Sequence, residues 1–209
     1  MVVRLHLIPF STNVERVALA LAHKRLDAQA VEHDPADRTA IRELSGQDLV
    51  PVIEHEGRVI ADSPAILEYL DELRPDPPLY PPEPARAAEM RTFVDWFNQV
   101  WKRSPNLIAH EASREAPDEA RIGRHAALMG AALDRFEALL TGRAYLFGDA
   151  PSAADFTAFP FLKYAARIDP SDDELFHRVL NEHQPLAAGH HRLREWIERV
   201  DDLPRTPPV

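Results

Sequence analysis

The chain has 209 residues, 45% of them hydrophobic, which allows one large or two small globular domains. Its net charge of −10, from 34 acidic against 24 basic residues, argues against nucleic-acid binding, because that function depends on neutralising phosphates with lysine and arginine. The absence of cysteine excludes disulfides, thiolate metal sites and a cysteine nucleophile. No apolar run approaches the roughly 18 residues of a membrane span, and no signal-peptide pattern opens the chain, so we expect a cytoplasmic protein that binds no membrane.

The first part of the chain alternates predicted strands and helices. Apolar residues at every second position predict a strand over 3–7, and a helix over 14–24 precedes a second strand over 29–33. A helix between two strands predicts parallel pairing with a right-handed crossover. A short helix over 38–45 is expected to end at Gly46.

The next stretch predicts a hairpin and a capped helix. A strand entered through a proline begins within 49–53, a tight turn is expected at Glu56-Gly57, and the strand returns over 59–61. Ser63 suits the N-cap of the following helix and Pro64 its first position. The resulting order, β-α-β-α-β-β-α, is that of a thioredoxin-like α/β domain.

The Val50-Pro51 bond has two interpretations. It is either an ordinary edge-strand proline or a cis bond. A cis bond would leave the Val50 N–H and C=O free to pair with an extended ligand, as an added strand does.

A proline-rich segment divides the chain. Residues 74–84 contain six prolines in eleven positions, which excludes regular structure and predicts a stiff linker. We therefore predict a thioredoxin-like domain over 1–75, a linker over 76–84 and an all-α domain over 85–209.

Helices are expected throughout that second domain. They are predicted over 85–103, ended by Pro105-Asn106, over 118–140, from Ser152 onward and over 190–202. Ser152 and Asp155 resemble a capping box, a folding signal to which we assign no catalytic role.

The motifs resemble those of the cytosolic glutathione transferases. Val-Pro-Val-Ile at 50–53, followed by Ala-Asp-Ser-x-Ala-Ile-x-x-Tyr-Leu at 61–70, is similar to the glutathione-binding half of that family. The linker and the helix start at 152–155 are similar to the family's two-domain pattern, so the resemblance covers essentially the whole chain. It implies a thioredoxin-like domain followed by an all-α domain, with glutathione as substrate or cofactor.

The resemblance also implies a set of glutathione-binding residues. The Val50 backbone, beside Pro51, would pair with the cysteinyl part of glutathione, and Asp62 and Ser63 would hold its γ-glutamyl end. Gln47 would lie near the glycine end, with Asp48 and Leu49 between it and Val50.

Ser11 is the catalytic candidate that the resemblance implies. Ser11 to Val17 is similar to the plant-type (phi) start motif, and Ser11 stands where bacterial glutaredoxin-like members often carry the first cysteine of Cys-Pro-Phe-Cys. A hydroxyl at a helix N-terminus can donate to a thiolate and lower the thiol pKa. Plain helix capping is the alternative, and Thr12 or Asn13 could face the sulfur instead; Asn13 is also a candidate glutathione contact.

Aromatic residues provide candidates for an electrophile pocket. Most aromatic residues are expected in the core, but Phe10, Trp101 and Tyr164 are our candidates for the pocket. No histidine pair has the spacing of a zinc site, and we expect no metal.

The leading hypothesis is a glutathione transferase that acts on a small hydrophobic electrophile, a detoxification activity, and that forms the homodimer usual for its family. The alternatives are a non-catalytic glutathione-transferase-like binding module, a glutathione-dependent isomerase of the maleylacetoacetate type, or the use of another low-molecular-weight thiol.

Overall fold

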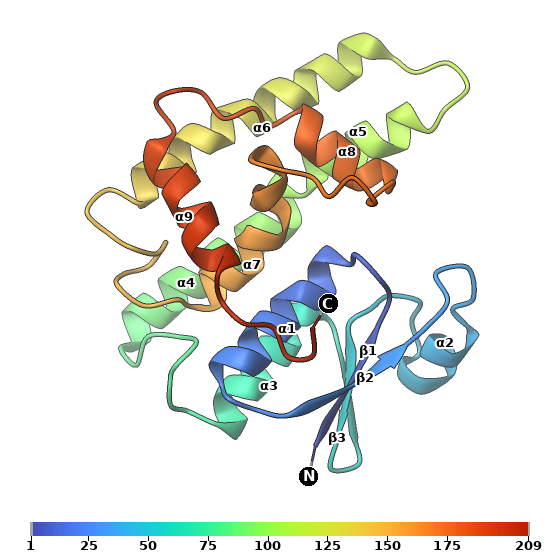
Figure 1. Ribbon diagram of the computed structural model, residues 1–209, viewed down its shortest axis with the longest axis vertical. Coiled ribbons are helices and arrows are strands. Elements are labelled where there is room, and N and C mark those ends of the chain that lie inside the picture. The colour runs from blue at the N-terminus through green and yellow to red at the C-terminus, as the bar shows by residue number, and fades with distance from the viewer. Residues whose placement is uncertain (1, 209) are drawn as a thin grey trace. The chain divides into compact units, whose positions relative to one another are not determined.

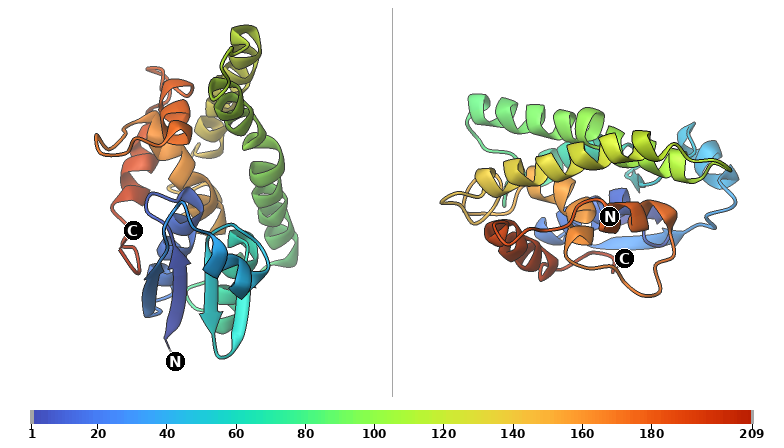
Figure 2. Two further views of the ribbon diagram at one scale, coloured as in Figure 1. Left: turned by 90° about the vertical axis from the view of Figure 1, so that its right-hand side faces the viewer. Right: turned by 90° about the horizontal axis from the view of Figure 1, so that it is seen from above.

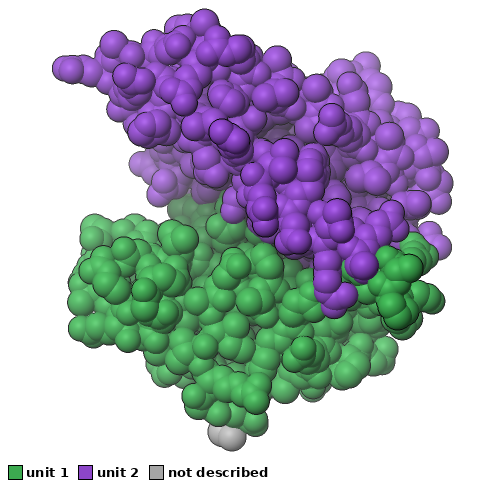
Figure 3. Space-filling model, turned by 180° about the vertical axis from the view of Figure 1, so that it is seen from behind, with its two compact units in different colours: residues 1–87, 203–209 green, residues 88–202 purple. Residues whose placement is uncertain are grey.

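The computed structural model describes residues 2–208 and divides them into two compact units (Figure 3). One unit runs to residue 87 and takes in the chain again from residue 203, and the other spans 88–202. Within residues 2–208, no helix combines the length and the apolar character needed to cross a bilayer.

A four-stranded mixed sheet forms the centre of the first unit. Its strands are β1 (Val3–Leu7), β2 (Ala28–Glu32), β3 (Val52–His55) and β4 (Arg58–Ala61), in the order β2-β1-β3-β4 (Figure 1). β1 pairs with β2 in parallel, as the β-α-β pattern predicts, and the other two pairings are antiparallel. The sheet is that of the thioredoxin-like fold.

Three helices complete this unit, α1 (Thr12–His23), α2 (Thr39–Ser45) and α3 (Ser63–Leu73). α1 and α3 contact each other, and their apolar stripes are buried. Gly46 caps α2 in the left-handed conformation at φ 77°, where a residue without a Cβ is favoured.

The linker packs against the first unit over much of its length. Residues 74–83 have neither helix nor strand, yet Leu79 and Tyr80 are buried. The fully buried Lys24 ammonium donates to the Arg74 carbonyl at 2.8 Å and to the Pro77 carbonyl at 2.6 Å, and it pairs with the Asp71 carboxylate. These contacts satisfy all three ammonium donors and fix the linker to the ends of α1 and α3.

The end of the chain differs from the predicted boundaries. Residues from 203 onward, which the sequence places in the helical domain, belong to the first unit. The Thr206 N–H donates to the Ala18 carbonyl of α1 at 3.0 Å, and Arg205 pairs with Glu15. These contacts join residues far apart in sequence, and no local pattern indicates them.

The second unit is all helical, apart from an isolated bridge between Tyr145 and Gly148. Its elements, in chain order, are α4 (Pro84–Trp96), the π-helical turn η1 (Phe97–Trp101), α5 (Arg103–Ala112), α6 (Glu119–Leu139), α7 (Ala153–Leu162), the 3₁₀ turn η2 (Lys163–Ala165), α8 (Leu175–Glu182) and α9 (His191–Asp201). α6 lies alongside α5 in both views of Figure 2.

One helix boundary in this unit was predicted wrongly. Pro105 and Asn106 do not end a helix, because Pro105 lies in the first turn of α5, where a missing N–H is tolerated.

The helix start at Ser152 is confirmed. The Asp155 Oδ2 atom accepts from the Ser152 N–H at 2.9 Å and from its hydroxyl at 2.7 Å. Asp155 Oδ1 accepts from the Leu146 N–H at 2.9 Å and the Trp196 indole N–H at 2.8 Å. Asp155 therefore joins α7, α9 and the loop before α7, which is a folding role.

Candidate functional site

Ser11 caps the first helix. Its backbone is extended, at φ −69° and ψ 113°, and its hydroxyl oxygen accepts from the Val14 N–H at 3.4 Å. Capping uses only an acceptor lone pair, so the hydroxyl hydrogen can still be donated to a ligand. The two interpretations of Ser11, as a cap and as a donor to an anion, are therefore compatible.

The neighbours of Ser11 are placed differently. Thr12 is 6% exposed, whereas Ser11 is half-buried. Asn13 is half-buried and already interacts within the protein. Phe10, just before the cap, is 48% exposed and has φ 58°, a left-handed conformation that is costly for a bulky residue. Such conformations concentrate at functional sites.

The start of α3 corrects one sequence prediction. The N-cap is Asp62, not Ser63, and Ser63 is the first helical residue. Asp62 is exposed, has φ 75°, and makes no capping hydrogen bond with its side chain. Asp62 therefore adopts a strained backbone conformation, and its carboxylate lies at the N-terminus of α3 without capping it.

Arg16 connects the two helix starts. Its guanidinium donates to the Ser63 hydroxyl oxygen at 3.1 Å and is only 1% exposed. Burial lowers the pKa of Arg16 to about 9, against the opposing effect of the Asp62 charge, so the side chain is still a cation at neutral pH. The first turns of α1 and α3 are thus joined through a buried positive charge, which agrees with a structural role for Arg16.

The segment before β3 offers an unpaired backbone. The Val50-Pro51 peptide is cis, as the strand-addition hypothesis requires. Neither the N–H nor the C=O of Val50 hydrogen-bonds with any residue in 2–208, although the Val50 side chain is buried. An extended peptide could pair with both groups.

Gln47 acts on this segment instead of projecting from it. Its side-chain amide donates to the Leu49 carbonyl and accepts from the Leu49 N–H, both at 2.7 Å. The amide therefore holds the residue that precedes Val50, and direct contact with glutathione would require these bonds to exchange.

The other two candidates for the electrophile pocket lie in the second unit. Trp101 stacks on Phe97, with ring centroids 4.5 Å apart, and its buried indole N–H has no hydrogen-bond partner within residues 2–208. The Tyr164 hydroxyl donates to the Asp172 carboxylate at 3.1 Å, and its ring stacks on His177. Trp101 is 4% exposed and Tyr164 3%, so both rings are largely packed within this unit.

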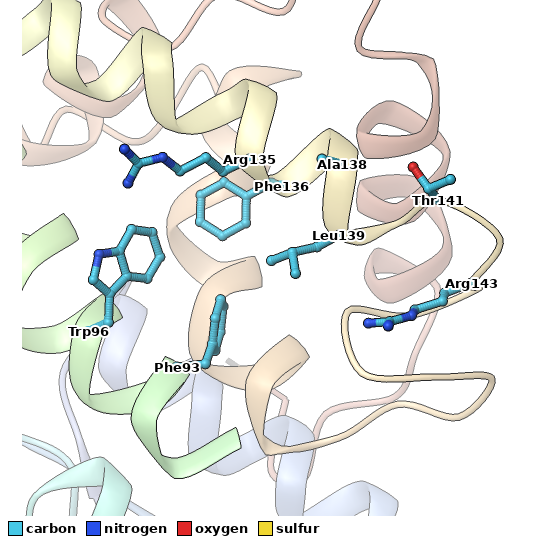
Figure 4. A pocket seen from close by; sticks show the side chains of 8 residues that line it. All are labelled: Phe93, Trp96, Arg135, Phe136, Ala138, Leu139, Thr141 and Arg143. Carbon is cyan, nitrogen blue, oxygen red and sulfur yellow. The ribbon is translucent and has the colours of Figure 1, made fainter. Parts of the chain in front are cut away.

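An apolar groove between α4 and α6 is a feature that the sequence does not predict (Figure 4). It has a volume of about 500 Å³ and is lined by Phe93 and Trp96 from α4, by Phe136 and Leu139 from α6, and by Arg135 and Arg143 among others. The sequence feature that could have indicated it is the helical spacing of aromatic residues over 85–103, most of which the sequence analysis places in the core. We call this feature the α4–α6 groove.

A polar cluster on the sheet was also missed. His6 lies 2.8 Å from both His33 and Glu54, through its two ring nitrogens. The pKa of His33 is lowered by burial and by the neighbouring His6 and Arg38. Nowhere in the described chain, residues 2–208, do three or more His, Asp or Glu side chains form a group that could hold a metal ion.

Comparison with known proteins adds to this geometry. A family model described as "Glutathione S-transferase, N-terminal domain" matches residues 5–78, and one described as "Glutathione S-transferase, C-terminal domain" matches residues 119–199.

Individual relatives are similar over most of the chain. FtsZ-localized protein A of Caulobacter vibrioides is 32% identical over 168 residues, which cover 74% of this chain and 73% of that protein. Maleylacetoacetate isomerase of Pseudomonas aeruginosa is 31% identical over 202 residues, which cover 88% of this chain and 91% of that protein. The crystal structure of a glutathione S-transferase from Rhodospirillum rubrum F11 superposes with a TM-score of 0.74 at 28% identity, covering 96% of this chain and 88% of that one.

Proposed function

Because the chain belongs to the glutathione S-transferase family, we propose that it binds glutathione at the joined starts of α1 and α3 and stabilises the thiolate for attack on a small hydrophobic electrophile. The observation that carries this proposal is the Arg16–Ser63 hydrogen bond, which brings together two helix N-termini. Each N-terminus favours an anion, and glutathione has a thiolate and a γ-glutamyl carboxylate to offer them.

Recognition would use the ammonium and the carboxylate of the γ-glutamyl residue and the backbone of the cysteinyl residue. The exposed Asp62 carboxylate accepts from the ammonium, and the first N–H groups of α3 receive the carboxylate. The Val50 N–H and C=O pair with the cysteinyl residue as a neighbouring strand would. This pairing directs the sulfur to the start of α1.

Ser11 would then stabilise the thiolate. A free thiol has a pKa of about 8.5, so only a few per cent ionises at neutral pH. The Ser11 hydroxyl donates to the sulfur, and the N-terminus of α1 adds its partial positive charge. Lowering the thiol pKa by about two units corresponds to about 2.7 kcal/mol. The thiolate forms the new bond to carbon while the leaving group departs with its electron pair.

Calorimetric titration with glutathione, paired with a turnover assay using 1-chloro-2,4-dinitrobenzene, tests this proposal. We expect saturable binding and formation of the conjugate. Absence of binding under all conditions would refute the glutathione site and would point to another low-molecular-weight thiol, which the same titration can examine.

Two relatives favour alternative functions that the same measurements separate. The similarity to FtsZ-localized protein A supports a non-catalytic module that binds a protein partner or a thiol peptide, for which glutathione would bind without turnover or not at all. The similarity to maleylacetoacetate isomerase supports a glutathione-dependent isomerase. Such an enzyme would convert maleylacetoacetate and would not conjugate 1-chloro-2,4-dinitrobenzene.

We also propose a homodimer formed through the α4–α6 groove. An open apolar groove of this size, next to the exposed side chains of Val100 and Leu128, is typical of an interaction surface. A detoxifying role in the cytoplasm would accompany the transferase activity.

A further inference from the structure

The C-terminal segment is bonded to the helix that bears Ser11. Residues from 203 onward return to the first unit and lie beside α1 (Figure 1). The Arg205 guanidinium donates to the Glu15 carboxylate at 2.9 Å, and the Thr206 N–H donates to the Ala18 carbonyl at 3.0 Å. The ion pair is largely shielded from water, with side chains 15% and 8% exposed, so its charges are screened less than those of a surface pair.

Glu15 is placed where its charge bears on the proposed thiolate. It lies in the first turn of α1, and its N–H donates to the Ser11 carbonyl at 3.0 Å. Ser11 is the N-cap and Glu15 lies one turn further along, and one helical turn rises about 5.4 Å. A carboxylate there stabilises the helix N-terminus, but it opposes a second anion at Ser11.

We infer that Arg205 neutralises Glu15 and so permits thiolate formation at the start of α1, which makes it a positioning residue supplied by the opposite end of the chain. This inference rests on the proposed glutathione site. The other charged groups at the helix starts, Arg16 and Asp62, have opposite charges, and the Asp62 charge favours the charged form of Arg16. Glu15 is paired with Arg205.

Charge-changing variants of the two partners distinguish this role from simple stabilisation. Arg205→Ala removes the guanidinium charge beside the Glu15 carboxylate and should raise the pKa of bound glutathione by about half to one unit. Glu15→Gln removes the carboxylate charge, keeps the guanidinium charge and should lower that pKa by a similar amount. A merely structural ion pair predicts the same direction for both variants, because either one breaks the pair.

The experiment measures the thiol pKa from the ultraviolet absorbance of the thiolate in the full-length protein saturated with glutathione. Arg205→Lys keeps the charge and should retain the wild-type pKa, and the double variant Glu15→Gln/Arg205→Ala should return close to it. Arg4→Ala, which breaks the Arg4–Glu54 pair near the start of β1, is the matched control and should leave the pKa unchanged. Circular dichroism verifies that each variant is folded.

Each result decides the inference. Opposite shifts in the two single variants support it, and equal shifts or no shift overturn it while glutathione still binds. If the wild-type protein binds no glutathione, the proposed function fails and this inference fails with it. If Arg205→Ala does not fold, Arg205→Gln, which also removes the charge but keeps a long polar side chain, supplies the comparison with Glu15→Gln.

Discussion

Two serine hydroxyls at helix starts, those of Ser11 and Ser63, have different hydrogen-bond partners and different exposure in this protein. The Ser63 oxygen accepts from the buried Arg16, whereas the Ser11 oxygen accepts only a long bond from a backbone N–H. Ser63 is 3% exposed whereas Ser11 is half-buried, so the Ser11 hydroxyl is the more accessible of the two for donation to a ligand. This difference comes from the surroundings and not from residue type.

Replacing Ser11 with alanine should raise the pKa of bound glutathione and cut turnover at pH 6.5 by about 10- to 100-fold, since one donor to the thiolate is lost. The loss should shrink at pH 9, where the thiol ionises without help. The pH profile of kcat/KM measures both effects. Asn13→Ala is the matched control; a larger loss in that variant than in Ser11→Ala would move the donor role to Asn13.

At the scale of single elements, buried carboxylates stabilise the starts of two helices in the second unit. In the first turn of α7, the buried Asp155 accepts from four donors. In the first turn of α9, the Arg192 and Leu193 N–H groups donate to Glu137, which belongs to α6. In both cases a carboxylate satisfies N–H groups that a helix cannot satisfy within itself.

Asp155→Ala should destabilise the fold by about 3–5 kcal/mol, because it leaves several buried donors without an acceptor. Urea unfolding measures the change. Ser152→Ala removes only one side-chain partner and should cost about 1 kcal/mol. Equal losses in the two variants would show that Asp155 has no role beyond the cap.

Glu137 should make part of the stability depend on pH. Burial raises its pKa, but hydrogen bonds from the Leu193 and Arg192 N–H groups outweigh burial, so the pKa lies below its ordinary value of 4.5. The unfolded chain therefore binds a proton at Glu137 more readily than the folded protein does. The stability contributed by the Glu137 carboxylate is complete above pH 4.5, and it is lost as the pH falls through the lower pKa of the folded state.

Unfolding experiments on Glu137→Gln check this dependence. At pH 7 the variant should be less stable by about 1–2 kcal/mol, and the difference from wild type should shrink below about pH 4.5. Glu195→Gln, at an exposed position of α9, should show no such trend. A difference that stays constant to pH 3 would contradict the assigned pKa direction.

At the scale of the whole molecule, the first unit is assembled from both ends of the chain, and the second unit has an open apolar surface. Stable interfaces between subunits usually bury a standard area of about 1,600 Å² around an apolar centre. The α4–α6 groove, with Trp96 and Arg135 shared by the adjoining smaller cavity, supplies such a centre.

Leu128→Glu should shift the protein from dimer to monomer, because a charge would enter the proposed interface from a side chain that is 60% exposed. Light scattering coupled to gel filtration measures the mass. Val2→Glu, at another exposed apolar position, should leave the mass unchanged. A wild-type protein that is monomeric at all concentrations would contradict the proposed homodimer.

The sequence predicted most elements and part of the site, but not how the site residues are bonded. It missed α5 and α8, and it placed the cap of α3 one residue late. Pro105 was interpreted as a helix breaker, but a proline is equally compatible with the first turn of a helix, which is where it lies in α5. It named Gln47 as a ligand contact but did not predict that the Gln47 amide is bonded to Leu49.

What the sequence determined by itself was the order of strands and helices in the first unit, the parallel pairing of β1 with β2, the Ser152–Asp155 start and the family. These depend on periodicity, on contacts a few residues apart and on short motifs. Only the tertiary structure decided that Arg16 joins two helix starts, that the chain end pairs with Glu15, and that α4 and α6 leave an open groove. The physical reason is that such contacts join residues up to 190 positions apart, and their partners are chosen by packing and burial, which no local pattern encodes.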